Sequence, residues 1–160
     1  MKWWLAVLLA AWLQAAWLPF IRPFDVVPNL VLAVIVLGTL RLSVSAGLGI
    51  AIVGGLLLDL AGGGWFGWSM LVLTAVVLVI GFVNIQVGWE VDGWWVPVLV
   101  TVVATAVIAC GIWLSVLAQG GQIEWSVVLK SLLLELVTNI VVVLFGRMLI
   151  DRRWSVKGGM

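Results

Sequence analysis

Six apolar stretches make up most of the chain, and only short polar or glycine-rich segments separate them. Their approximate ranges are 3–20, 26–40, 42–60, 65–85, 94–118 and 125–150. Of the 160 residues, 65% are hydrophobic and 9% are charged, whereas an ordinary soluble domain has about 25% charged residues. Open strand edges cannot be satisfied in lipid, and about 20 helical residues cross a bilayer. The sequence therefore predicts an all-α membrane protein, a six-transmembrane-helix bundle in which residues 1–160 form one transmembrane domain.

Basic residues and one proline refine this layout. Residues 26–60 are too long for one spanning helix, so we expect a tight hairpin at Arg41. Pro28 fits the first turn of the second span, where a missing N–H is tolerated. The positive-inside rule predicts both termini in the cytoplasm. This orientation places Arg22 outside and the following residues inside: Lys2, Arg41, Arg147, Arg152, Arg153 and Lys157.

The first stretch has a second interpretation as a cleaved signal peptide, because Lys2 precedes an apolar run with alanines near its end. No clear cleavage motif follows, and the run is rich in tryptophan. Cleavage would leave five spans, so both interpretations stay open here.

The composition argues against several classes of function. A formal net charge of +1 provides no basic face for nucleic acid. The chain contains no histidine, and its single cysteine, Cys110, is expected to be buried within an apolar run. Glu90 and Asp92 are best explained as residues of a solvated turn. We therefore expect no enzyme activity, no catalytic residue, no metal site and no bound cofactor.

Small residues recur every fourth position through the third stretch, which places them on one helical face. They are Ser43, Gly47, Ala51 and Gly55, and the series ends at Asp59. Gly49 and Gly54 leave a second face of this helix without bulky side chains. The helix is therefore expected to be central, packed on more than one side. Such a stripe allows close helix packing, either within the monomer or against another protein.

Asp59 lies near the end of this apolar stretch, just before three consecutive glycines. A carboxylate is costly in hydrocarbon unless it finds a partner. Gly62 to Gly64 permit a sharp reversal through positive φ angles, after which the free N–H groups of the fourth helix could point at Asp59. We expect Asp59 to cap that helix and lock the hairpin. A contact with a partner or a solute path is the alternative, and both roles are compatible.

The sixth stretch carries polar or small residues on one face: Ser131, Glu135, Thr138, Asn139 and Gly146. Glu135 lies about 15 Å along the helix from Trp125, close to the bilayer centre. Glu135 and Asn139 are one turn apart and are expected to share a hydrogen-bond network, with the acid neutral. These residues either fix helix register or form a functional contact.

Several of these features form one pattern. Pro28-Asn29 opens a short apolar span, Arg41 lies at a turn, and residues 54–67 have the sequence GGLLLDLAGGGWFG. This pattern resembles the MreD family, the rod shape-determining membrane proteins of bacteria. The resemblance places the family motif on Pro28, Asn29, Gly54, Gly55, Asp59 and Gly67. It also implies a fold similar to the substrate-binding S-components of energy-coupling-factor transporters.

The resemblance implies a noncatalytic scaffold subunit of the cell-wall elongation complex, with several membrane spans in the bacterial cytoplasmic membrane. Such a subunit binds the transmembrane helix of MreC. It links MreB filaments to RodA and a class B penicillin-binding transpeptidase, and a homodimer or a bound membrane lipid is compatible with this role.

The alternative is an S-component-like subunit that binds a small solute or vitamin for transport. Alanine spacing in the first stretch keeps this alternative open, at Ala6, Ala10, Ala11 and Ala15. Thr105, Glu135 and Asn139 are few polar groups for a vitamin site.

Overall fold

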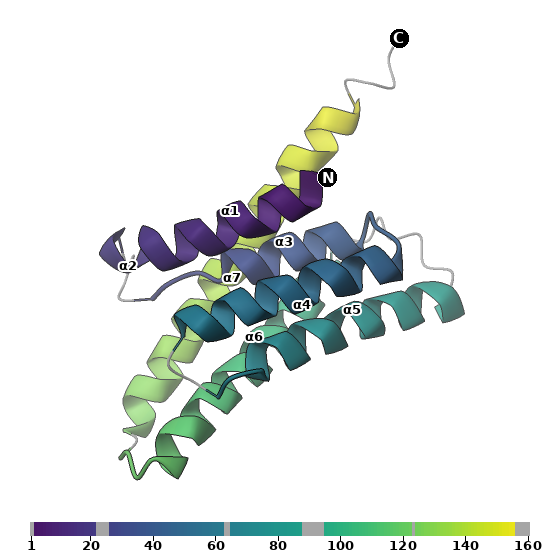
Figure 1. The fold of residues 1–160 in the computed structure, drawn as a ribbon. Coiled ribbons are helices and arrows are strands. Elements are labelled where there is room, and N and C mark those ends of the chain that lie inside the picture. Colours follow the sequence, from purple (N-terminus) through teal and green to yellow (C-terminus); the bar gives the residue numbers. More distant parts are fainter. Residues whose placement is uncertain (1, 22–25, 63–64, 88–94, 123, 156–160) are drawn as a thin grey trace.

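The computed structural model describes residues 2–21, 26–62, 65–87, 95–122 and 124–155, and its regular secondary structure in these residues is all helical (Figure 1). The helices are α1 (Lys2–Ala16), α2 (Leu18–Ile21), α3 (Leu30–Thr39), α4 (Val44–Ala61), α5 (Trp68–Val87), α6 (Trp95–Ala118) and α7 (Trp125–Ser155). Each of the six predicted apolar stretches thus contains one helix of at least ten residues. Arg22, Glu90, Asp92 and Lys157 lie outside the described residues.

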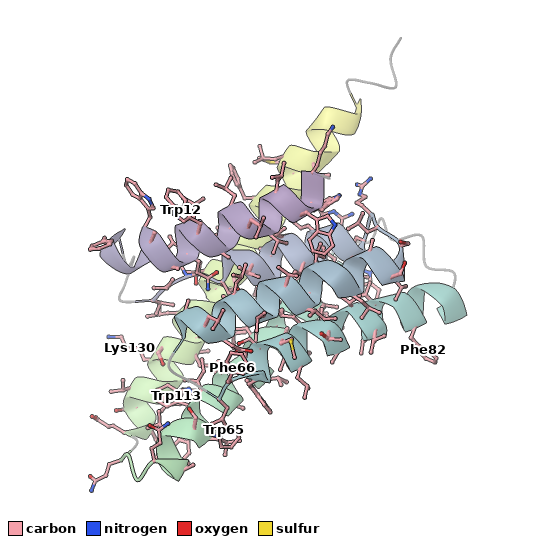
Figure 2. The ribbon with its side chains drawn as sticks, in the orientation of Figure 1. Trp12, Trp65, Phe66, Phe82, Trp113 and Lys130 are labelled. Carbon is pink, nitrogen blue, oxygen red and sulfur yellow. The ribbon has the colours of Figure 1, made fainter. Side chains whose placement is uncertain are left out.

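Three of the described helices are long and apolar enough to cross a membrane: Val44–Ala61, Trp95–Ala118 and Trp125–Ile150. Shorter apolar helices cover Lys2–Ala16, Leu30–Thr39 and Trp68–Phe82. Large apolar side chains cover the outside of the bundle, and Figure 2 shows Trp12 and Phe82 projecting away from it. Lipid, not water, suits such a surface, so the chain is a membrane protein.

Helix α3 lies at the centre of the bundle and contacts α1, α4, α5, α6 and α7. All of its residues from Val31 to Thr39 are buried except Val34. The third predicted span, α4, is packed on more than one side, as expected, but α3 and not α4 is the central helix. Helix α4 packs against α1, α3 and α5 but leaves Ile52 exposed. The sequence could not distinguish the two helices because an all-apolar helix suits lipid as well as a protein core.

The first two predicted spans differ from the structure at their ends. The first is broken after Ala16, and the short helix α2 follows. The second begins as a helix only at Leu30, with Asn29 as its N-cap, so Pro28 precedes the cap and is not in the first turn. The expected hairpin at Arg41 is confirmed, because α3 ends at Thr39 and α4 starts at Val44.

Helices α4 and α5 pack closely because small residues meet larger ones across their interface. A Cβ at Gly47 would lie 2.9 Å from Val77 Cγ1, and one at Gly81 would lie 2.6 Å from Val44 Cγ2. A Cβ at Gly55 would overlap Met70 Cα. Helix α5 of the same chain therefore covers much of the small-residue stripe of α4.

The other small residues of α4 also lie inside the bundle. Ala51 is fully buried in the core. A Cβ at Gly54 would lie 2.8 Å from Val31 Cγ1 and 3.1 Å from Val7 Cγ1, so this glycine lets α3 and α1 approach α4. Helix α1 is thus an integral part of the packing.

The start of α1 and the end of α7 lie at the same end of the bundle. Trp3 and Ile150 both pack against the small buried cluster of Ala33, Leu37 and Val143. At the surface, Cys110 is exposed on α6, so the expectation that it is buried is wrong. An apolar run does not separate a core position from a lipid-facing one.

Gly55→Ala should destabilise the bundle, because the added Cβ would overlap Met70 Cα and lie 2.6 Å from its backbone nitrogen. Overpacking of this kind costs about 1–3 kcal/mol. Gly49→Ala is the matched control, since its Cβ would meet only the ring end of Trp4 at 3.0 Å. Thermal unfolding in detergent compares the two variants. Equal melting temperatures would contradict the close α4–α5 contact.

Candidate functional site

The Asp59 carboxylate caps the start of helix α5. Its Oδ2 accepts hydrogen bonds from the backbone N–H groups of Gly67 at 2.9 Å and Met70 at 3.2 Å, and its Oδ1 accepts one from Ser69 at 3.0 Å. These donors have no acceptor within the first turn of their own helix. The predicted cap is therefore confirmed, and one side chain ties the end of α4 to the beginning of α5.

Gly67 explains why the cap comes from another helix. It immediately precedes α5 and has no side chain that could cap it, and its φ of 91° favours glycine. The predicted positive φ at Gly62 is wrong, because this residue ends α4 in an extended conformation with φ of −91°. Gly63 and Gly64 lie outside the described residues. Gly55, one turn before Asp59, allows the first turn of α5 to approach α4.

Hydrogen bonds with other helices also satisfy backbone N–H groups at the buried start of the central helix α3. We call the Asp59 cap the first joint and this set of bonds the second joint. Asn29 Oδ1 accepts from the N–H of Leu32 at 2.9 Å, and the N–H of Asn29 donates to Asn139 Oδ1 of α7 at 2.6 Å. Asn139 Nδ2 in turn donates to Thr105 Oγ1 of α6 at 3.0 Å. Asn29, Thr105 and Asn139 are all buried. This chain of polar groups connects α3, α6 and α7.

Gln14 of α1 completes this second joint. Its Oε1 accepts from the N–H of Val31 at 3.3 Å. The sequence analysis missed Gln14, although a lone glutamine within an apolar stretch is a usable signal of a buried partner.

Glu135 does not take part in the network that was predicted for it with Asn139. Asn139 instead makes its bonds to Asn29 and Thr105. Within the described part of the chain, the Glu135 carboxyl group has no hydrogen-bond or ion-pair partner, and its oxygens are not fully buried. Helix spacing put the two residues on related faces, but the neighbouring helices determined where each side chain bonds.

Glu135 and Asp59 line the same cavity of about 450 Å³. Six helices or helix starts contribute to its wall. Polar lining residues are Gln14, Asn29, Asp59, Ser69, Ser115 and Glu135, and Trp65 and Trp68 are among the apolar ones. The two acids are separate features in the sequence, because nothing in their spacing shows that α4 and α7 line one cavity.

Trp68 fixes one wall of this cavity. Its indole Nε1 donates to the backbone carbonyl of Val107 at 3.2 Å, so α5 is bonded to α6. A Cβ at Gly111 would overlap this indole, so the glycine makes room for it. The ring of Trp65 lies edge-on to that of Trp68, with centroids 6.3 Å apart. Trp68 therefore both joins α5 to α6 and shapes the cavity.

The hydrogen bonds between helices hold the bundle together, and the polar side chains that line the cavity can bind a polar group of a ligand. Among the described residues, no three His, Cys, Asp or Glu side chains lie close enough to hold a metal ion. The serine that lines the cavity on α6, Ser115, donates its hydroxyl to the carbonyl of Ile112.

Asp59→Ala should lower the melting temperature in detergent, because three N–H groups lose their acceptor. An unsatisfied buried donor costs about 1–3 kcal/mol. Asp59→Asn keeps one acceptor oxygen, so its melting temperature should lie between those of Asp59→Ala and the wild type. Amide hydrogen exchange at Ser69 and Met70 should accelerate in parallel, whereas Glu124→Ala, which removes only an exposed acceptor of the Ser126 hydroxyl, should leave the exchange at these two amides unchanged.

Asn139→Ala and Thr105→Val form a double-mutant cycle for the second joint. Interhelical hydrogen bonds in membranes contribute about 0.6 kcal/mol on average, and we expect a coupling energy of that order. Asn139→Ala alone should cost more than Thr105→Val, because it also removes the acceptor of the Asn29 N–H. Thr138→Val is the control, since that hydroxyl donates to Leu134 of its own helix. A coupling of zero would show that the Asn139–Thr105 hydrogen bond does not stabilise the bundle.

Comparisons of the chain with protein-family models, with curated proteins and with solved structures found no match. Its function therefore has to follow from its own residues and their geometry.

Proposed function

We propose that this chain is a noncatalytic membrane scaffold subunit of the bacterial cell-wall elongation complex, as its resemblance to the MreD family implies. In this role it crosses the cytoplasmic membrane six times with both termini inside. It binds the transmembrane helix of MreC and links MreB filaments to RodA and the class B penicillin-binding transpeptidase.

The observation that carries the proposal is the position of the motif residues. Asn29 and Asp59 cap the starts of two helices, Gly54 and Gly55 let helices approach, and Gly67 precedes α5. These residues serve to give the bundle a fixed shape. A fixed shape suits a protein that holds partners in position, and no reaction is needed for this role.

A groove between α5 and α6 supports binding of a partner's single apolar helix. It has a volume of about 290 Å³. Its lining is almost entirely apolar and includes Leu71, Val79, Leu99, Val103 and Val107, all of which are exposed. Helices associate in lipid mainly through close packing, and a hollow surface offers more contact than a convex one. We therefore assign the MreC helix to this groove.

Photo-crosslinking from the groove tests the proposal. A photoreactive residue at Val103 should form an adduct with co-expressed MreC, whereas one at Val137 of α7 should not. The two positions are matched, with 55% and 58% of the side chain exposed. Failure of MreC to co-purify with the wild-type chain would overturn the scaffold role. Equal crosslinking from Val137 would overturn only the choice of groove.

The cavity lined by Asp59 and Glu135 favours a second candidate, a solute-binding subunit similar to an S-component. Its volume of about 450 Å³ falls in the range of small-molecule sites. Several polar side chains converge on it, as substrate-binding sites in membranes require. A rise in melting temperature on adding candidate vitamins would favour this function over the scaffold role.

A further inference from the structure

We infer that the cavity between Asp59 and Glu135 binds an organic ammonium group, with Glu135 as its counter-charge and the indoles of Trp65 and Trp68 as its wall. This inference rests on the cavity and on neither function above. The crosslinking experiment and the experiment below can therefore fail separately.

The charged side chains that line the cavity indicate which charge its ligand carries. Among the described residues, the lining has two acidic side chains, Asp59 and Glu135, and no lysine or arginine. Lys130, the described base nearest to Glu135 in sequence, is exposed and does not line the cavity (Figure 2). An anionic ligand would be repelled by the Glu135 carboxylate, which no described base in the lining offsets. A cation is the complementary ligand.

The two acids have different roles. Both oxygens of Asp59 already accept backbone N–H groups of α5, and the positive end of that helix offsets part of its charge. The Glu135 carboxyl has no partner among the described residues, yet it faces a cavity within an otherwise apolar bundle. A charged acid in such surroundings is costly unless a counter-charge pairs with it. An ammonium ion provides both the charge and the N–H donors, so Glu135, which the sequence predicts to be neutral, is charged when the ion is bound.

The aromatic wall distinguishes an organic ammonium ion from a metal cation. Trp65 and Trp68 both line the cavity, with the second indole held by its bond to Val107. Indole is the best aromatic partner for cations, which it attracts over its ring face within about 6 Å. Ile108, Ile112 and Val116 provide an apolar surface for the carbon part of the ligand. Two sources share this chemistry: the ethanolamine headgroup of a phospholipid and a free amine.

Thermal unfolding of the full chain in a neutral detergent tests the inference. Hexylammonium should raise the melting temperature, whereas hexanol and hexanoate at the same concentration should not, because binding to the folded state alone stabilises it. In a second arm, short-chain phosphatidylethanolamine should stabilise the chain more than short-chain phosphatidylglycerol. Stabilisation in only one arm supports the inference and identifies the source as a lipid or a free amine.

The Glu135→Gln variant tests whether stabilisation by the ammonium probe comes from binding in the cavity. This variant keeps the size of the side chain and should leave the fold intact, while the apparent affinity for the ammonium probe falls at least tenfold. Glu124→Gln makes the same change at an exposed acid outside the cavity and should retain the full response. An undiminished response in Glu135→Gln would overturn the inference. Equal stabilisation of the wild type by hexanol and hexylammonium would also overturn it, even if the variant does not fold.

Discussion

The structure depends on one constraint: every helix that starts inside the apolar bundle must find acceptors for its first N–H groups within the protein. Lipid offers none, and each unsatisfied group costs several kcal/mol. The chain meets this requirement twice with side chains from other helices. Asp59 of α4 caps α5, while Asn139 of α7 and Gln14 of α1 accept from the segment that opens α3. These bonds fix which helices are neighbours.

Glycine makes the Asp59 cap geometrically possible and lets the helices beside it pack closely. Gly55 lets the first turn of α5 approach α4 one turn before Asp59, and Gly54 lets α3 and α1 approach the same helix. Close backbone approach and buried polar caps therefore act together. A bundle held in this way keeps a fixed shape without a water-driven hydrophobic effect between its helices. This property connects the packing to the proposed scaffold role.

The same joints also shape the cavity. Asn29, Asp59 and Gln14 contribute to its lining as well as to the capping of helix starts. Glu135 differs, because it lines the cavity and its carboxyl group has no hydrogen bond to another described residue. A residue that only stabilised the fold would be expected to bond to its neighbours, as Asn139 does. This contrast is the physical basis for assigning Glu135 to a ligand.

The sequence by itself determined the helical class, the positions of the apolar helices, the hairpin at Arg41 and the cap at Asp59. These follow from local rules, because lipid forces helices and a lone acid before glycines needs nearby donors. Only the tertiary structure decided that α3 is central, that Asn139 bonds to Asn29, and that Asp59 and Glu135 share a cavity. In an apolar chain, lipid-facing and buried positions have the same composition, so the pattern cannot specify which helices meet.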